Sequence, residues 1–419
     1  MLGQILSIIS TRKARYALVV LCLILCFYLG LRLRKVARSH SVAQKPARNI
    51  WSEACPSWPL SSAPVSNTTL RFPDKGPSKE TVDMLYKMLQ ERLDQVKDKP
   101  LPDFSKPCNI SSPELKACTS VQCPGKIHTS LEERVKDVLS SPELQLANEH
   151  RAAIATYSAM FPTNDIIIVS ATSSNHFGET QKMFYSLHRD IYPILKNFSV
   201  VLVDIGLSES ERILAEKKCR CKVIRFPHHL FPAHVGVNTC YSFKPLSVLA
   251  AIHKARRLVV WQDSSVRWTL TGLRHIMERA DRYGSQIVRT PGSARVTAHT
   301  LRQPFDYMKR EVCAFTTFPE IEACAQVHRN DPVTLRLVLE PWARCALERC
   351  CICPVEPGPV LPCTKSISQH RCQRFDQSAM TIILGRLLNA DFEKVAMPHE
   401  VEKQPIFYKL GGDELKNYF

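Results

Sequence analysis

Short apolar runs alternate with amphipathic helical patterns between residues 165 and 263, and this alternation constrains the fold more than any other feature. The runs at 165–170 and 258–262 are rich in β-branched and aromatic residues, which is typical of buried strands. Between them, residues 178–195 place apolar side chains on one face of a helix. Because strands that alternate with helices usually pair in parallel, we predict a mostly parallel, Rossmann-like α/β sheet flanked by helices.

The amino-terminal residues predict a membrane anchor. Residues 16–31 contain no charged side chain, and the segment 16–33 is long enough to span a thin bilayer. A cleaved signal peptide is the alternative, but its only tolerable cleavage site, at residues 41–43, lies far from the apolar run. Basic residues flank the run on both sides, so their distribution leaves the orientation open. We predict a tail at 1–15 and a signal-anchor helix at 16–33.

Glycosylation sequons and cysteines favour a lumenal body. Three sequons follow the predicted anchor, at Asn67, Asn109 and Asn197, and so do fifteen of the seventeen cysteines. Cysteine-rich bodies suit an oxidising compartment. We therefore expect a single-pass type II protein of the Golgi or endoplasmic reticulum membrane with a cytosolic tail, since a short span favours thinner membranes.

The formal net charge of +17 suggests an anionic partner. Nucleic acid is not expected, because the basic residues are scattered and form no stripe with interleaved aromatic residues. The positive charge either belongs to an ordinary solvated surface or produces a field that attracts anionic substrates such as nucleotide diphosphates or acidic glycans.

The predicted lumenal part divides into a stem at 34–160 and a body at 161–419. Proline-rich and serine-rich stretches of the stem cannot bury a continuous core. Apolar residues recur at helical spacing within 84–96, and this segment could pair with a second copy, so a homodimer is an open prediction. The body has the length of one large domain.

Six cysteines lie between residues 345 and 372. Their spacing does not form a clean pair of zinc-binding knuckles, and the compartment oxidises thiols, so we predict disulfides. An odd number of lumenal cysteines leaves one unpaired, which could form an intermolecular bridge.

Polar side chains follow the predicted strands at the edge where open α/β sheets bind ligands. Thr172, Ser174 and Asn175 follow the first strand and could meet a ribose or base, although serine and asparagine also cap helices. Asp204 ends the second strand, and for it ligand binding and helix capping remain equal alternatives. Lys244 opens a helix, where a lysine is unusual unless it meets diphosphate oxygens.

Several segments together resemble the nucleotide-sugar-binding half of glycosyltransferases with the A-type fold. They are Lys244-Pro245 before a helix, residues 259–265 ending in Asp263-Ser264-Ser265, and residues 374–379 near the carboxyl terminus. Residues 204–208 and 375–379 also resemble a mostly uncharacterised family of type II membrane proteins with glycosyltransferase-like domains. The likeness covers roughly residues 160–400, and the order of the segments carries it.

The resemblance implies a metal site that this chain completes only in part. Relatives carry Asp-x-Asp after the corresponding strand, whereas this chain carries Asp263 and Ser265. Asp263 would hold Mn²⁺ or Mg²⁺ on the donor diphosphate, and a hydroxyl at Ser265 is a poorer ligand. His399, after a predicted strand at 393–397, resembles a late histidine ligand of some members; a surface histidine is the alternative.

The resemblance also implies catalytic roles near the carboxyl terminus. Asp376 and Gln377 begin a predicted helix where relatives place an acidic residue against the sugar or acceptor. If the reaction inverts the anomeric centre, Asp376 is the candidate general base. The alternative is a carboxylate that only meets the positive end of the helix dipole.

These expectations combine into two functions. The first is transfer of a sugar from a nucleotide-diphosphate donor to a glycan, protein or lipid acceptor. The second is a non-catalytic glycosyltransferase-like lumenal protein that binds a glycan or a protein, which the missing second carboxylate favours. Fold alone does not decide between them.

Overall fold

A computed structural model describes most of the chain beyond the predicted anchor. The described residues are 55, 76–96, 127–128, 130–290, 295–354, 363 and 372–419. They belong to one compact unit, Glu53–Phe419. Within these residues no helix is both long and apolar enough to cross a bilayer. The predicted anchor at 16–33 lies outside them, as do Asn67 and Asn109.

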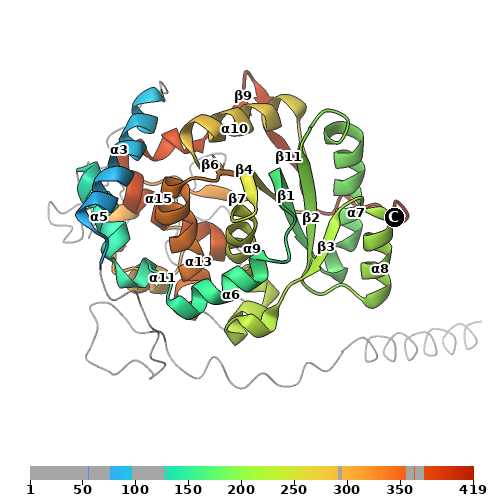
Figure 1. Ribbon diagram of the computed structural model, residues 1–419, viewed down its shortest axis with the longest axis horizontal. Helices are drawn as coiled ribbons and strands as arrows, with labels where there is room; N and C mark the ends of the chain where they lie inside the picture. Colours follow the sequence, from blue (N-terminus) through green and yellow to red (C-terminus); the bar gives the residue numbers. More distant parts are fainter. Residues whose placement is uncertain are drawn as a thin grey trace, which may run out of the picture. The chain divides into compact units, whose positions relative to one another are not determined.

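A seven-stranded sheet in the order β3-β2-β1-β4-β7-β6-β8 forms the centre of the unit (Figure 1). Neighbouring strands pair in parallel, except that β7 runs antiparallel to both β4 and β6. The predicted mostly parallel α/β sheet is therefore confirmed. The strands are β1 (Asn164–Thr172), β2 (Phe198–Asp204), β3 (Lys222–Arg225), β4 (Ala255–Gln262), β6 (Gln286–Arg289), β7 (Ile321–Arg329) and β8 (Ala396–Met397).

The connections create a switch point between β1 and β4. From β1 the chain moves outward through β2 to β3, and it then returns to place β4 on the other side of β1. Val169 of β1 lies beside Trp261 of β4, and Thr172 lies beside Asp204 of β2. Because these strands are parallel and in close register, their carboxyl ends meet at one edge of the sheet. Such an edge is where doubly wound sheets bind ligands.

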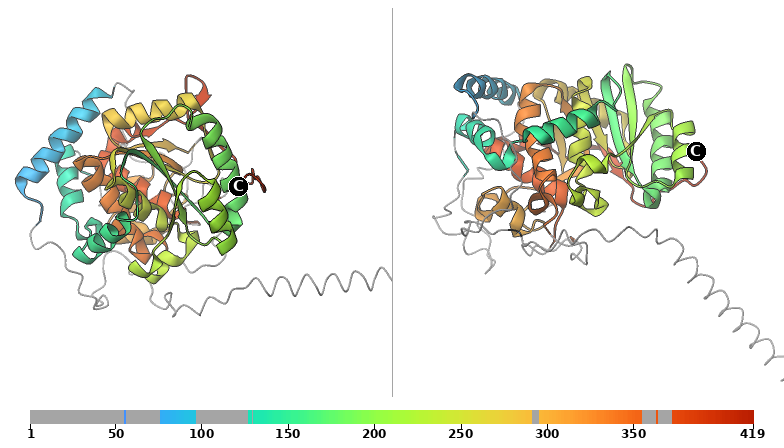
Figure 2. Two further views of the ribbon diagram at one scale, coloured as in Figure 1. Left: turned by 45° about the vertical axis from the view of Figure 1, so that its right-hand side comes forward. Right: turned by 60° about the horizontal axis from the view of Figure 1, so that its bottom comes forward.

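Helices cover both faces of the sheet (Figures 1 and 2). Alternate side chains such as Ile168, Leu202 and Val260 pack into one apolar core with helices α7, α8 and α10. On the other face α9 packs against β1 and β4, and α15 packs against β7. The helices are α7 (Phe177–Ser186), α8 (Glu209–Lys218), α9 (Phe243–Ile252), α10 (Leu270–Tyr283) and α15 (Phe375–Leu388).

Three helices from the predicted stem pack onto this body. They are α3 (Lys79–Gln95), α5 (Leu131–Ser140) and α6 (Asn148–Ser158). Leu85 and Leu89, on the predicted pairing face of α3, are buried within the chain, where α3 contacts α5 and α10. Arg134 of α5 donates from Nε to the carbonyl oxygen of Leu387 in α15 at 2.8 Å. Residues before position 161 therefore pack against the helices that cover the sheet.

The later half of the body contains more regular structure than its sequence pattern predicts. Strand β7 buries Glu322, Gln326 and His328, so it lacks the apolar run that marks a central strand. The predicted strand at 393–397 is wrong in its first part: Glu393 lies in a 3₁₀ helix over Asn389–Lys394, and β8 contains only Ala396–Met397.

The described cysteines other than Cys324 form disulfides, which confirms that part of the prediction. The pairs include Cys55–Cys350, Cys219–Cys221, Cys240–Cys353, Cys345–Cys351 and Cys363–Cys372. Among the cysteines that the structure describes, Cys324 is free, and it is buried. A bridge between two chains through Cys324 would therefore require this part of β7 to open.

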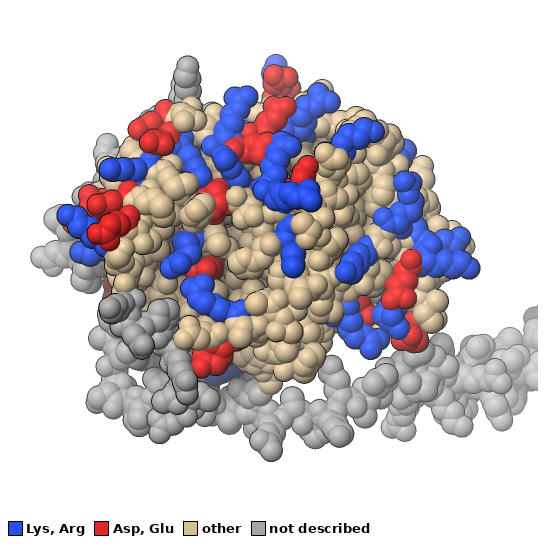
Figure 3. Space-filling view, in the orientation of Figure 1, with Lys and Arg blue, Asp and Glu red and all other residues tan. Residues whose placement is uncertain are grey.

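Lysines and arginines are spread widely over the face of the molecule seen in Figure 3, with acidic side chains among them. On this face the basic groups do not form one continuous stripe. The view agrees with the scattered distribution of charge along the sequence.

Candidate functional site at the carboxyl edge of the sheet

Asp263 follows β4 directly, at the switch point between β1 and β4. Its backbone nitrogen donates to the carbonyl oxygen of Cys324 in β7 at 2.8 Å. The Trp261 indole nitrogen donates to Asp263 Oδ1 at 2.8 Å. The carboxylate remains 32% exposed. Two neighbouring elements thus hold Asp263 in place while one side of it meets solvent.

Lys244 joins two of the predicted site residues, Asp263 and Asp376. Its Nζ lies 3.1 Å from Asp263 Oδ1 and 2.9 Å from Asp376 Oδ2. It also donates to the carbonyl oxygen of Ala323 at 3.2 Å. The lysine side chain is only 3% exposed. An ammonium group has three N–H donors, and here three acceptors surround it. We call Lys244, Asp263 and Asp376 the Lys244 cluster.

The charges of the Lys244 cluster depend on one another. Burial favours the neutral amine of Lys244, but Asp263 and Asp376 outweigh it and raise the lysine pKa above its ordinary value. Burial raises the pKa of Asp376, Lys244 opposes that rise, and Asp263 adds to it. The ammonium form of Lys244 is therefore favoured, and the pKa of Asp376 is raised above its ordinary value.

Two aromatic residues in an unusual backbone conformation border the Lys244 cluster. Tyr241 has φ 54° and Phe375 has φ 39°, values that side-chain-bearing residues rarely adopt. Their ring centroids lie 6.0 Å apart, and Lys244 Nζ lies 5.6 Å from the centre of the Tyr241 ring. Tyr241 is 42% exposed. Strained backbone of this kind gathers at functional sites, and here it presents an aromatic surface beside the ammonium group.

The start of α15 places Asp376 and Gln377 beside the first residues of β7. The Trp342 indole nitrogen donates to the Asp376 carbonyl oxygen at 2.9 Å. Gln377 Oε1 accepts from the backbone nitrogen of Ala323 at 3.5 Å. Within the described part of the chain, Gln377 Nε2 is buried and has no hydrogen-bond partner. Gln377 therefore connects the α15 amino end to the strand that also supplies Ala323.

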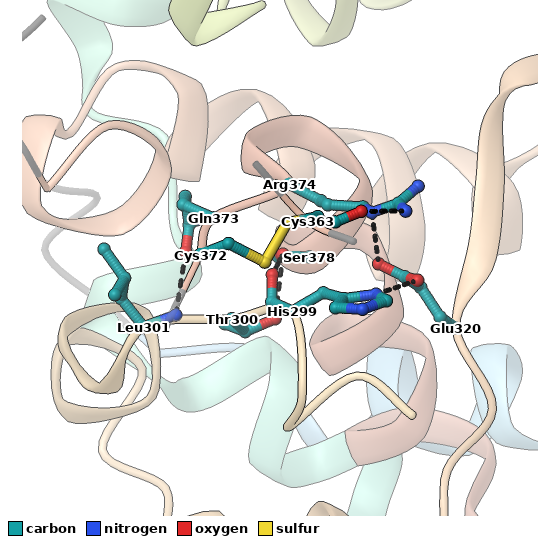
Figure 4. The surroundings of a disulfide bond; sticks show 9 residues. All are labelled: His299, Thr300, Leu301, Glu320, Cys363, Cys372, Gln373, Arg374 and Ser378. Atoms are coloured by element: carbon teal, nitrogen blue, oxygen red, sulfur yellow. Dashed lines mark hydrogen bonds and ion pairs between the residues drawn. A yellow bond between two sulfur atoms is a disulfide. The ribbon is translucent and has the colours of Figure 1, made fainter. Parts of the chain in front are cut away.

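A buried polar group that the sequence did not reveal supports the start of α15 (Figure 4). Glu320 is fully buried and accepts from His299 Nδ1 at 2.8 Å, and Arg374 Nε lies 3.5 Å from its carboxylate. The disulfide Cys363–Cys372 lies beside this group. No local pattern marks Glu320 or His299, because they meet only after β7 and α15 pack together.

The predicted loop after β1 reaches the same edge but uses its polar side chains within the chain. Thr172 is buried, and its hydroxyl accepts from Thr180 at 2.7 Å. Ser174 donates to the Gly206 carbonyl oxygen at 3.2 Å, which links the loops that follow β1 and β2. Asn175 is exposed and accepts from the Ser173 hydroxyl at 2.5 Å. Among the three predicted donor-site residues here, Asn175 and Ser174 remain accessible to a ligand.

Asp204 shapes the turn that follows β2. Its Oδ1 accepts from the backbone nitrogens of Gly206 at 2.9 Å and Leu207 at 2.7 Å, and Arg225 Nε lies 3.7 Å from Oδ2. The side chain is 3% exposed. In this structure Asp204 closes the turn after β2, whereas the amino-terminal cap of α8 is Ser208, whose hydroxyl accepts from the Glu211 backbone nitrogen at 3.3 Å.

Glu179 is a further buried carboxylate at this edge that the sequence did not single out. It accepts from the Ser264 hydroxyl at 3.1 Å and from the backbone nitrogen of Gly412 at 2.5 Å. His176 Nδ1 lies 3.1 Å from it. Glu179 thus connects the loop after β1, the residue next to Asp263, and the carboxyl-terminal segment.

The residues around Asp263 do not fit the divalent metal that the resemblance implies. Asp263 Oδ1 already contacts Lys244 and Trp261. Ser265 brings a hydroxyl where a second carboxylate is expected, and the ring of His399 packs against Phe407 with centroids 4.8 Å apart. In the described ranges no three His, Cys, Asp or Glu side chains are grouped so that they could hold a metal ion.

The remaining predicted position, Asn197, lies in the turn before β2. It is exposed and has φ 51°, a conformation that asparagine tolerates better than most residues. Its side chain is therefore accessible to an enzyme that modifies sequons.

One family model matches the chain, at residues 134–250, and its description reads "Protein of unknown function (DUF1647)". No curated protein sequence matches. The match runs from α5 through most of α9, so it includes Lys244 but stops before Asp263.

Solved structures similar to the chain include glycosyltransferases. Mouse xyloside xylosyltransferase 1 has a TM-score of 0.32 and 12% identity, with 60% of this chain and 98% of that chain covered. Core-mannan synthase A from Aspergillus fumigatus, in a Mn/GDP form, has a TM-score of 0.30 and 6% identity, with coverages of 53% and 69%. An active-site mutant of LgtC gives 0.26 and 14%, and the chain covers 59% of its length. The fold assignment itself rests on the strand order described above.

Proposed function

We propose that this chain transfers a sugar from a nucleotide-diphosphate donor to a glycan, protein or lipid acceptor in the secretory pathway. The observation that carries the proposal is the position of the Lys244 cluster. It lies at the carboxyl end of β4, beside the switch point where sheets of this type bind nucleotides. The sequence resemblance to glycosyltransferases, drawn from the same residues, supports the choice of donor.

In this proposal the chain acts by positioning the donor and stabilising the leaving group. Asn175 and Ser174 lie at the loop after β1, where they would meet the nucleoside. Tyr241 offers an exposed ring for stacking against a base or a sugar. The amino end of α9 would face the place where the diphosphate gains charge as it leaves, and Lys244 offsets part of the negative charge of Asp263 and Asp376 there.

Asp376 can act as the proposed base only if its carboxylate separates from Lys244. Its side chain is 7% exposed and is paired with Lys244. To accept a proton from an acceptor hydroxyl, the carboxylate must leave Lys244 when the acceptor binds. Without such a movement, Asp376 acts as a positioning residue that holds the ammonium group.

The test is thermal stability of the purified chain with a panel of nucleotide diphosphates and nucleotide sugars, followed by transfer assays with the donor that binds. We expect one donor to raise Tm. Asp263→Asn should reduce that shift, because it removes one of the three partners that hold Lys244 in place. Asp281→Asn is the matched control, since Asp281 pairs with Arg257 near the start of β4, away from the site. Absence of any shift would contradict the proposal.

A non-catalytic binding protein is the second candidate, and one observation favours it. Lys244 pairs with both carboxylates that relatives would use, so neither Asp263 nor Asp376 is free in this structure. This candidate predicts that a glycan or protein raises Tm while no nucleotide does, and that Asp263→Asn leaves the biological activity unchanged.

The proposed lumenal location has its own test. Treatment of the protein from cells with an N-glycosidase should increase its electrophoretic mobility. Asn197→Gln should remove one glycan, because Asn197 is exposed in the turn before β2. A protein without N-glycans at Asn67, Asn109 and Asn197 would contradict the proposed orientation.

A further inference from the structure

The place between Asp263 and Asp376 is already filled by a cation. Lys244 Nζ lies 3.1 Å from one carboxylate and 2.9 Å from the other, and Ala323 supplies the third acceptor. The two carboxylate oxygens are therefore no more than about 6 Å apart, with the nitrogen between them. Lys244 Nζ donates hydrogen bonds to Asp263 Oδ2 at 3.5 Å and to the Ala323 carbonyl oxygen, and it forms an ion pair with Asp376. Its side chain is almost fully buried.

A divalent ion at this position would first have to displace the lysine. Displacement would remove three acceptors from a buried ammonium group and leave it unpaired, which is strongly unfavourable. Only after the lysine has left would the ion find the two carboxylates as protein ligands, with water completing its coordination.

We propose that Lys244 is the resident cation of this site and that the chain binds its anionic ligand without a divalent metal ion. The role resembles that of an ion in one respect: a fixed positive charge lies between two carboxylates at the carboxyl edge of the sheet and offsets one of their two negative charges. That a nucleotide diphosphate binds here without a metal ion rests on the proposed function. That Lys244 excludes a metal ion from the cluster does not rest on the proposed function, and it is measured separately.

The first measurement uses MnCl₂ alone and the full-length chain. We expect no Mn²⁺ bound at the cluster in electron paramagnetic resonance titrations, and the same Tm in MnCl₂ and in EDTA. Stoichiometric, EDTA-reversible Mn²⁺ binding that Asp263→Asn abolishes would overturn the inference. This measurement needs no nucleotide, so it stands whether or not the proposed function is correct.

The second measurement removes the built-in cation. Lys244→Met keeps an apolar side chain of similar length but leaves Asp263 and Asp376 facing each other without a positive charge. We expect MnCl₂ to raise the Tm of this variant by several degrees, and the added substitution Asp263→Asn to abolish the rise. Lys254→Met, just beyond the carboxyl end of α9, is the matched control and should show no response. A folded Lys244→Met variant that ignores MnCl₂ would overturn the role given to Lys244.

If Lys244→Met does not fold, the double variant Lys244→Met with Asp376→Asn replaces it, because this variant loses one buried carboxylate together with the cation. The wild-type titration then decides the inference. The nucleotide panel separates the two proposals: equal Tm shifts in EDTA and in MnCl₂ support this inference. Shifts seen only with MnCl₂ overturn it and leave the proposed function standing. No shift in either condition rejects the proposed function, and the MnCl₂ titration still decides the role of Lys244.

Discussion

The environment of a single side chain decides what each candidate residue can do. Lys244, Asp263 and Asp376 each had a separate role when judged from the sequence, as phosphate, metal and acceptor contacts. In the structure they share one buried ion pair, so a change at any of them alters the other two. The ends of strands and helices identify these three residues as candidates. Their contacts with one another could not be predicted from the sequence, because 113 positions separate Asp263 from Asp376.

Trp261→Phe tests how firmly Asp263 is held. The substitution keeps an aromatic ring but removes the 2.8 Å hydrogen bond from the indole nitrogen to Asp263 Oδ1. Hydrogen bonds to charged groups contribute about 1.5–3 kcal/mol, and partial exposure of Asp263 favours the lower end. We expect urea unfolding to show a loss of about 1–2 kcal/mol. The same loss in an Asp263→Asn background would mean that the two side chains are not coupled.

His328 predicts a dependence of stability on pH. Burial lowers its pKa from 6.5 to about 3, and it bonds to Ser285 and Gln326. Because the folded pKa lies below the unfolded one, the stabilising contribution is complete above pH 6.5 and is lost as pH falls toward 3. His328→Gln should reduce the difference between the unfolding free energies at pH 7 and pH 4. An unchanged difference would contradict the assigned pKa.

At the scale of elements, an ion network ties α5 to α15. Arg386 of α15 donates to both oxygens of Asp137, at 2.7 and 3.0 Å, and lies 3.4 Å from Glu143. Arg386 is 2% exposed. The sequence placed α5 in a stem because proline-rich and serine-rich stretches of that region cannot bury a continuous core. Its packing follows from partners more than 240 positions away, which local patterns do not reveal.

Arg386→Met tests whether α5 is part of the folded body. The change removes a buried guanidinium from Asp137 and Glu143, which keep Arg310 and Lys309 as partners. We therefore expect a loss at the lower end of the about 3–5 kcal/mol that breaking a buried ion pair costs. Arg212→Met, in the surface pairs of α8 with Glu209 and Glu216, should cost less than about 1 kcal/mol. The measurement is chemical unfolding of both variants. Equal effects would show that α5 docks without this network.

For the whole molecule, disulfides connect segments that are distant in the chain. Cys240–Cys353 joins residues 113 positions apart, whereas Cys219–Cys221 spans two. Closing a long loop restricts the unfolded chain more, so the paired Cys240→Ser and Cys353→Ser substitutions should cost about 2–5 kcal/mol. The Cys219 and Cys221 pair should cost clearly less. Comparison of Tm values in non-reducing buffer decides this, and equal losses would contradict the argument from loop length.

The sequence by itself determined the fold class, because the alternation of β-branched runs and amphipathic segments appears directly in the order of residues. It also identified the carboxyl ends of the strands as the place for polar side chains such as Asp263. It did not reveal β7, whose buried Glu322, Gln326 and His328 interrupt the apolar pattern of a central strand.

Only the tertiary structure decided the composition of the site. Burial removes water from Lys244 and requires acceptors for its three N–H groups, and those acceptors come from β4, the start of β7 and the start of α15. Periodicity along a chain records which face of an element is buried. It does not record which charged groups from distant elements must meet there to neutralise one another.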